Sequence, residues 1–176
     1  MISIQIPDIN NNISTLRAGD QVLLSGTLFT ARDAAHIRLA ELIAGNKPLP
    51  MDLAGAVIYY CGPCPAKPGE PIGSCGPTTA SRMDPFTPVM LSQGIIAMIG
   101  KGPRSPATVA AIQQHGAVYF AATGGIAALL AGKVITSTLI AFGDLGPEAI
   151  YRLEVKNFPL LVAIDSQGNN IYDTKR

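Results

Sequence analysis

Short runs of continuous apolar residues recur along this chain, separated by polar or glycine-rich segments. These runs do not alternate between apolar and polar positions, as a half-exposed strand would. They are typical of strands that are covered on both faces. The pattern predicts strands at residues 21–29, 56–60, 94–99, 117–121, 134–142 and 160–164.

Helical signals lie between these predicted strands. Residues 31–44 carry an apolar stripe with helical spacing, Thr30 is placed to cap the first turn, and Gly45 stops the segment. A second helix begins at Ser105-Pro106 and ends at Gly116. Shorter helical segments are predicted from Thr87, over residues 124–131 and around residues 144–147.

Strands that alternate with helices indicate an α/β fold with a covered sheet. The chain has 176 residues, which is enough for one proper core and short for two, so we expect a single domain over residues 1–176. Hydrophobic residues make up 48% of the chain and charged residues 14%, which excludes a disordered protein.

Charge and hydropathy exclude several classes of partner. The net charge is +1, without a basic stripe or an acidic tail, which argues against nucleic acid and anionic membranes. Residues 123–143 are as long as a membrane span, but Lys133 lies at their centre and favours a short helix followed by a buried strand. Residues 1–7 lack the pattern of a secretory signal, so we expect a cytoplasmic protein.

The segment 61–85 is irregular, rich in Gly and Pro, and holds all three cysteines: Cys61, Cys64 and Cys75. An odd number of cysteines without a secretory signal argues against structural disulfides. Two interpretations stay open at this point. The thiols are either small side chains in a tight loop, or ligands of a metal or a redox pair.

Three cations follow predicted strand ends or lie in the long loop between them. They are Arg32 in Thr30-Ala-Arg-Asp33, Arg82 in Gly76-Pro-Thr-Thr-Ala-Ser-Arg-Met-Asp84, and Lys101 in Ile99-Gly-Lys-Gly102. Such positions carry function in α/β folds. Two guanidinium groups and an ammonium suit a small dicarboxylate, with Thr30 and Thr78 near helix starts that favour anions. The alternative is that these cations are solvated surface residues.

Other polar features carry weaker signals. His36 lies within the first predicted helix and His115 at the end of a later one, neither with a neighbouring ligand pattern. Thr123-Gly-Gly125 resembles a phosphate cradle but lacks the Lys-Ser/Thr of a P-loop, so close backbone packing explains its glycines better.

The run Gly76-Pro-Thr-Thr-Ala-Ser-Arg-Met-Asp84 resembles the signature of the C-terminal domain of class I fumarases, a family that includes tartrate dehydratase β subunits. Three further segments agree in order and spacing, so the resemblance covers residues 16–172. They are Ser25-Gly-Thr-Leu-Phe-Thr-Ala-Arg-Asp-Ala-Ala-His36, Ile99-Gly-Lys-Gly102, and Asp144-Leu-Gly-Pro-Glu-Ala-Ile150 with Glu154 and Phe158-Pro159.

The resemblance implies a swivelling β/β/α domain that works with a larger α subunit carrying a [4Fe–4S] cluster. This chain would supply no metal ligand, and the expected assembly is a heterotetramer. Arg32, Arg82 and Lys101 would bind the carboxylates of the substrate, and Thr78 would be the catalytic acid/base residue. The expected reaction is the reversible hydration of fumarate to malate.

Three alternatives stay open beside this reading. The first is a β subunit of tartrate dehydratase or of a related hydroxy-diacid dehydratase. The second is a metal- or redox-binding module built on Cys61, Cys64 and Cys75. The third is a non-catalytic interaction subunit that retains the fold.

Overall fold

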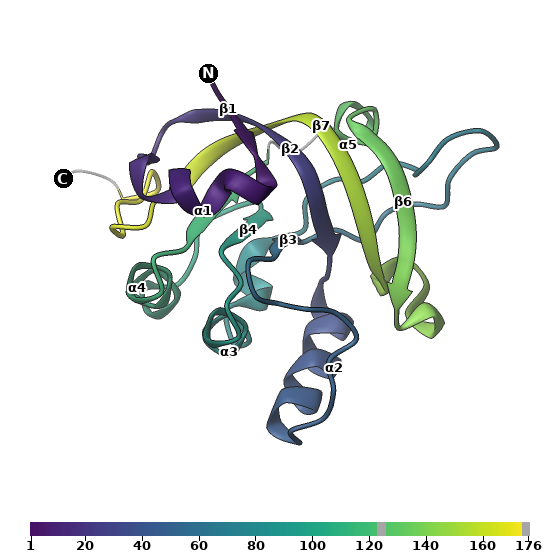
Figure 1. Cartoon of the computed structure of the whole chain (residues 1–176), viewed down its shortest axis with the longest axis horizontal. Helices are drawn as coiled ribbons and strands as arrows, with labels where there is room; N and C mark the ends of the chain where they lie inside the picture. The colour runs from purple at the N-terminus through teal and green to yellow at the C-terminus, as the bar shows by residue number, and fades with distance from the viewer. Residues whose placement is uncertain (123–125, 174–176) are drawn as a thin grey trace.

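The computed structural model describes residues 1–122 and 126–173. Strands and helices alternate along most of the chain (Figure 1). The described residues also form four short 3-10 turns, named η1 to η4. In chain order the elements are β1 (Ile2–Gln5), η1 (Ile6–Asp8), α1 (Ile9–Asn12), η2 (Ile13–Thr15), β2 (Gln21–Thr30), α2 (Asp33–Ala44), β3 (Val57–Tyr59), η3 (Ala80–Met83), α3 (Thr87–Ser92), β4 (Ala97–Gly100), α4 (Pro106–Gln114), β5 (Val118–Ala121), α5 (Ala127–Ala131), β6 (Val134–Ala141), η4 (Gly143–Glu148) and β7 (Ile150–Ile164).

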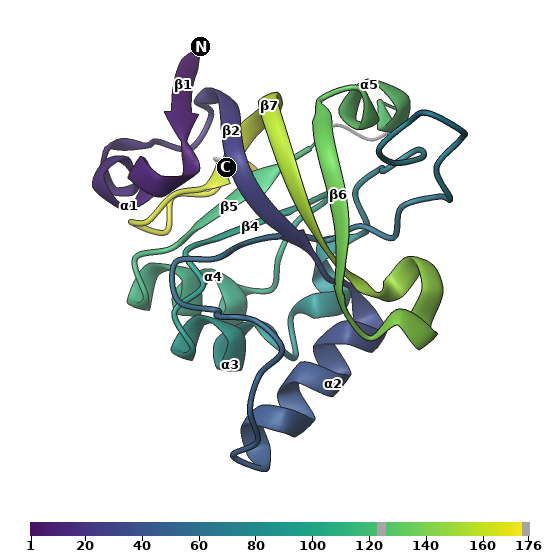
Figure 2. The ribbon, with the colours of Figure 1, turned by 45° about the vertical axis from the view of Figure 1, so that its right-hand side comes forward.

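The strands form one mixed sheet of seven, in the order β1-β2-β3-β4-β5-β7-β6. Neighbours from β1 to β5 are parallel, as strands joined through helical crossovers usually are. β7 runs antiparallel to β5, β6 and β2. Because β2 pairs with both β3 and β7, the pairings among β2, β3, β4, β5 and β7 close into a ring. In Figure 2, β2 and β7 arch over β4 and β5 accordingly.

Two hydrophobic cores share this sheet. The inner core lies within the ring and includes Leu24, Tyr59, Phe120 and Phe158, all fully buried. The outer core lies under α2, α3 and α4, which cover the same side of the sheet (Figure 1). Strands such as β4 are therefore buried on both faces, which explains their continuous apolar runs. The predicted α/β fold is confirmed, with a β/β/α layering.

Most predicted elements lie where the pattern placed them, but three strands differ. β7 begins at Ile150, far before the predicted start at residue 160, because its first half alternates buried residues with exposed ones such as Arg152. β1 was missed, since it is only four residues long and mostly exposed. β6 is present, but the prediction of a buried strand was wrong. Among the described residues β6 pairs with β7 alone, at the sheet edge, and it is largely exposed.

The predicted cap at Thr30 was also wrong. α2 starts at Asp33, with Arg32 as its N-cap residue and no side-chain cap. The buried Thr30 hydroxyl instead accepts from the Tyr151 amide at 3.0 Å and donates to the Ala149 carbonyl at 3.3 Å. It therefore fixes the start of β7 to the end of β2. The predicted cap at Ser105 is confirmed, since its hydroxyl accepts from the Thr108 amide at 3.3 Å.

Candidate active site

The carboxyl ends of three neighbouring parallel strands bring most of the predicted site residues to one edge of the sheet. Arg32 follows β2 and Lys101 follows β4, while the Thr78 backbone lies between the ends of β3 and β4. The Thr78 amide donates to the Tyr60 carbonyl at 2.7 Å, and the Thr78 carbonyl accepts from the Lys101 amide at 3.2 Å. The edge is therefore held by backbone hydrogen bonds, which fix residue positions closely.

Thr78 and Thr79 differ sharply in their environment. Thr78 is buried, with 8% of its surface exposed, whereas Thr79 is exposed and contributes a backbone bridge to Lys101. Among the described residues, the Thr78 hydroxyl has no hydrogen-bond partner. Gly100 makes room for this segment, because a Cβ there would lie 2.9 Å from Tyr60 Cδ2 and 3.0 Å from Ala80 Cβ. Close packing thus explains the first glycine of Ile99-Gly-Lys-Gly102.

Arg32 and Arg82 meet through a shared carboxylate. Asp33 accepts from Arg82 Nε at 2.8 Å and from Arg82 Nη2 at 2.6 Å, and Arg32 Nε reaches the same carboxylate at 3.1 Å. Glu148 of η4 adds a second ion pair to Arg32 Nε, at 2.7 Å. Burial opposes ionisation of Asp33, but the hydrogen bonds from Arg82 and Arg32 outweigh it and hold the pKa of this carboxyl below its usual value. Asp33 therefore stays charged at neutral pH.

Lys101 lies outside this charge cluster. Its side chain is exposed and forms no ion pair within the part of the chain that the structure describes. The structure thus brings Arg32 and Arg82 together, and Thr78 beside Lys101 through the backbone. Asp33 and Glu148 balance the charges of the two arginines, so Lys101 is the one of the three predicted cations that has no ion-pair partner among the described residues.

His36 contacts the backbone of Arg32, which the sequence did not reveal. The imidazole is buried, packs against Tyr60 and Phe86, and its Nδ1 lies 3.0 Å from the Arg32 carbonyl. Burial lowers the pKa of His36 to about 4, so the ring is neutral near pH 7. Nδ1 is then the protonated nitrogen, because a carbonyl only accepts. His36 is a positioning residue and not a ligand.

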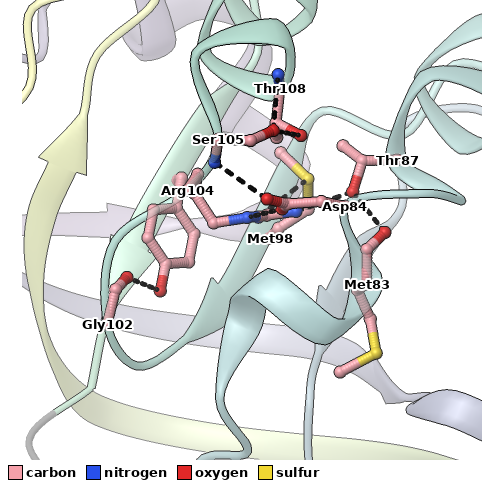
Figure 3. A network of polar contacts seen from close by, with 9 residues as sticks. Met83, Asp84, Thr87, Met98, Gly102, Arg104, Ser105 and Thr108 are labelled. Atoms are coloured by element: carbon pink, nitrogen blue, oxygen red, sulfur yellow. Dashed lines mark hydrogen bonds and ion pairs between the residues drawn. The ribbon is translucent and has the colours of Figure 1, made fainter.

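A buried ion pair between Arg104 and Asp84 ties two site-bearing segments together, as Figure 3 shows. The Arg104 side chain is fully buried, and its Nε donates to Asp84 Oδ1 at 2.6 Å. Arg104 Nη2 donates to the Thr87 hydroxyl at 2.6 Å, and the Ser105 amide donates to Asp84 Oδ2 at 2.8 Å. The guanidinium also lies over the rings of Tyr60 and Tyr119. The charge of this buried cation is therefore compensated by a carboxylate, a hydroxyl and two aromatic rings.

This ion pair matters for the site because of where its members lie. Asp84 comes two residues after Arg82, and Arg104 comes three residues after Lys101. The ion pair thus joins the end of η3 to the loop that follows β4. Asp84 belonged to the recognised motif, but nothing in the sequence paired it with Arg104.

The site is open to solvent on this chain. Arg82 and Lys101 are exposed, and Arg32 is partly so. Two hollows, of about 260 Å³ and 560 Å³, flank the loop of residues 61–75, and neither is lined by Arg32, Thr78, Arg82 or Lys101. A surface that lacks an enclosing wall binds a small anion weakly, because water screens the charges.

The three cysteines do not form a metal centre. Cys61 and Cys75 are buried, Cys64 is exposed, and all three are free thiols. A hydrogen bond with Cys75, together with burial, raises the pKa of the Cys61 thiol, which disfavours the thiolate that a metal requires. Within residues 1–122 and 126–173, no three His, Cys, Asp or Glu side chains are grouped closely enough to hold a metal ion. The residues that the structure describes therefore do not fit an iron–sulfur cluster.

Two weaker candidates remain from the sequence. His115 is exposed and caps the end of α4. Thr123-Gly-Gly125 lies outside the described residues. Among the described residues, none of the helices is both long enough and apolar enough to span a membrane.

Comparison with known proteins places this chain in a family. The chain matches the family described as the fumarase C-terminus over residues 1–175. It belongs to the fumarase C-terminal family. The resemblance inferred from four ordered motifs is confirmed.

Relatives of different lengths share the domain. The chain is 38% identical to fumarate hydratase 1, mitochondrial, of Leishmania major over 96% of this chain and 31% of that protein. It is also 38% identical to the anaerobic class I fumarate hydratase of Escherichia coli, over 94% of this chain and 30% of that enzyme. A Methanocaldococcus jannaschii protein provisionally named L(+)-tartrate dehydratase subunit beta is 42% identical, over 92% of this chain and 86% of its own length. The chain thus spans about a third of the fumarate hydratases.

Proposed function

We propose that this chain is the β subunit of a [4Fe–4S]-dependent hydro-lyase that reversibly hydrates fumarate to malate. The observation that carries the proposal is the site itself. A buried threonine beside a lysine, and two arginines joined by a carboxylate, lie at adjacent strand ends of a fumarase C-terminal domain. The identities of the relatives named as class I fumarate hydratases support the same reaction.

The proposed roles follow from the chemistry of the side chains. Arg32 and Arg82 bind the substrate carboxylates through planar guanidinium groups, and Lys101 adds a point charge. Proton removal from C3 of malate leaves extra negative charge on one carboxylate, and these cations stabilise it. Thr78 Oγ1 holds the proton that moves to or from C3. Thr78 is largely buried, so closure of the site by the partner would exclude water from its hydroxyl and favour proton transfer over exchange with solvent.

A separate α subunit is part of the proposal. The fumarate hydratases are about three times as long as this chain, so the chain corresponds to one part of them. The M. jannaschii relative is named as a β subunit and is covered over most of its length, which supports a two-subunit arrangement. The open site also needs a second surface to close it. We propose that this partner carries the cluster and that the assembly is a heterotetramer; a cytoplasmic location stays a prediction.

Tartrate is the second candidate substrate. The 42% identity to the M. jannaschii protein with a tartrate dehydratase name favours it. Tartrate carries a further hydroxyl at the carbon where malate carries only hydrogens, so a site built for one should reject the other measurably.

The test is co-production of this chain with its α subunit, followed by assays of both substrates. Hydration of fumarate at a kcat/KM well above that for tartrate dehydration supports the proposal. The opposite ratio would assign the chain to tartrate, and a complex without either activity would favour the interaction subunit.

A further inference from the structure

The carboxylate of Asp33 lies between the two arginines that are proposed to bind substrate. It accepts two hydrogen bonds from Arg82, at 2.8 Å and 2.6 Å, and one from Arg32, at 3.1 Å. Its side chain is 30% exposed, so the group is partly shielded from water. A carboxylate that bridges two like charges keeps them close together, where alone they would repel each other.

The contacts with Asp33 and Glu148 occupy the Nε side of each guanidinium group. Arg82 uses its Nε and Nη2, and Arg32 uses its Nε, which also contacts Glu148. Among the described residues, neither Nη1 of Arg82 nor the two Nη groups of Arg32 have a hydrogen-bond partner. The end of each guanidinium group, formed by Nη1 and Nη2, therefore remains available; we call it the outer edge. Each outer edge can bind one carboxylate through two hydrogen bonds.

The surroundings give the two arginines unequal freedom. Arg32 is backed by Gly62, where a Cβ would lie 3.1 Å from Arg32 Cδ and 3.3 Å from its Nη1. Arg82 projects from the short turn η3, and its side chain is 48% exposed. Such a side chain is flexible by itself. Asp33 is its ionic partner in the described part of the chain, so Asp33 decides where the Arg82 outer edge points.

We propose that Asp33 is a positioning residue that holds Arg32 and Arg82 side by side and presents their outer edges to the two carboxylates of a dicarboxylate. This inference rests on the proposed function and extends it. It assigns the preference for two carboxylates over one to a residue that does not itself contact the substrate.

A competing explanation predicts the opposite effect of Asp33→Asn on dicarboxylate binding. If Asp33 merely occupied the arginines while the site is empty, it would compete with substrate. Asp33→Asn would then tighten dicarboxylate binding, because a competitor and a negative charge are both removed. If Asp33 positions the arginines, the same change weakens binding, since Arg82 must be ordered by the substrate itself.

The experiment compares Asp33→Asn with Glu41→Gln in the assembled complex. Glu41 lies on α2 and is exposed, so its variant makes the same change in net charge without touching either arginine. We expect Asp33→Asn to lower kcat/KM for fumarate by about 10- to 100-fold, the range in which small misplacements act. Glu41→Gln should stay within about twofold, as a distant surface charge does. Unchanged or higher kcat/KM in Asp33→Asn would overturn the inference.

Two four-carbon inhibitors separate positioning from general damage. Succinate carries two carboxylates and butyrate one, so the ratio of their inhibition constants reports simultaneous use of both arginines. We expect this preference to fall about tenfold in Asp33→Asn, the worth of one charge-assisted contact. Equal weakening of both inhibitors would point to a structural role and overturn the inference.

Failure of the proposed function would show separately, as a wild-type complex that hydrates no fumarate. The inference is then tested on the full chain with phenylglyoxal, which modifies accessible guanidinium groups. Arg82 should react several-fold faster in Asp33→Asn than in Glu41→Gln, as read by mass spectrometry. Equal rates in the two variants would contradict the role of Asp33.

Discussion

Replacement of Asp84 by Asn should destabilise this domain more than any exposed charge change of the same kind. Both Asp84 oxygens accept from donors, Arg104 Nε at 2.6 Å and the Ser105 amide at 2.8 Å. The amide group of Asn would turn an N–H towards one of these donors. The Arg104 cation, fully buried, would keep its charge without a counterion.

The size of the stability loss follows from the burial of Arg104. Removing one partner of a buried ion pair costs about 3–5 kcal/mol, because the remaining charge is neither solvated nor paired. Small domains are stable by only about 5–15 kcal/mol, so this loss is a large share of the total. For a chain of this size it corresponds to a fall in Tm of roughly 6–20 °C.

The assay is chemical denaturation of Asp84→Asn beside Asp144→Asn. Asp144 binds Arg38 through two oxygens as well, but this pair lies at the exposed surface. Solvent screens such a pair, so its loss should be small. Adding Arg104→Met to Asp84→Asn should restore much of the lost stability, since the uncompensated cation is gone. Equal losses in the two single variants would refute the reasoning.

Three further outcomes are expected. Arg82→Lys keeps the charge but loses the planar fork. The kcat/KM for fumarate in the complex should therefore fall by a factor that corresponds to about 1.5–3 kcal/mol of transition-state binding. Unchanged kinetics would remove Arg82 from the site. The folded-state pKa of His36 is depressed to about 4, so the unfolded state binds more protons between pH 4 and 6.5. The free energy of unfolding should therefore fall by about 3 kcal/mol as the pH drops through that window. Urea titrations of wild type and His36→Gln check this, and an equal pH dependence in both would contradict it. The chain alone should be folded, colourless and inactive; cluster absorption that Cys61→Ser abolishes would contradict this.

Continuous apolar runs made most of the sheet predictable, because strands buried on both faces leave a strong local signal. β7 escaped in part, since Arg152 and other outward-facing residues break the apolar run in its first half. Closure of the sheet by β2 and β7 could not be predicted either. It depends on pairings across more than a hundred residues, and local sequence carries no information about them.

The candidate site shows the same division. Arg32, Thr78 and Lys101 could be placed at one edge because parallel strand ends converge there. The partners of the arginines could not, because Asp33 and Glu148 act through side-chain geometry. Thr30 was misassigned for a similar reason: a threonine before a helix is a common cap, but here the tertiary contact with β7 takes its hydroxyl.

The most direct test of the account is the turnover of fumarate by the rebuilt complex with Thr78→Val or Thr79→Val. Thr78 is buried at the proposed site of proton transfer, whereas Thr79 is exposed and makes no side-chain cap for η3. We predict that Thr78→Val assembles and melts like wild type but loses about 10²–10⁴-fold in kcat, the usual cost of losing a general acid/base. Thr79→Val should keep wild-type kcat. Wild-type kcat in Thr78→Val, or a collapse of kcat in Thr79→Val alone, would contradict the account.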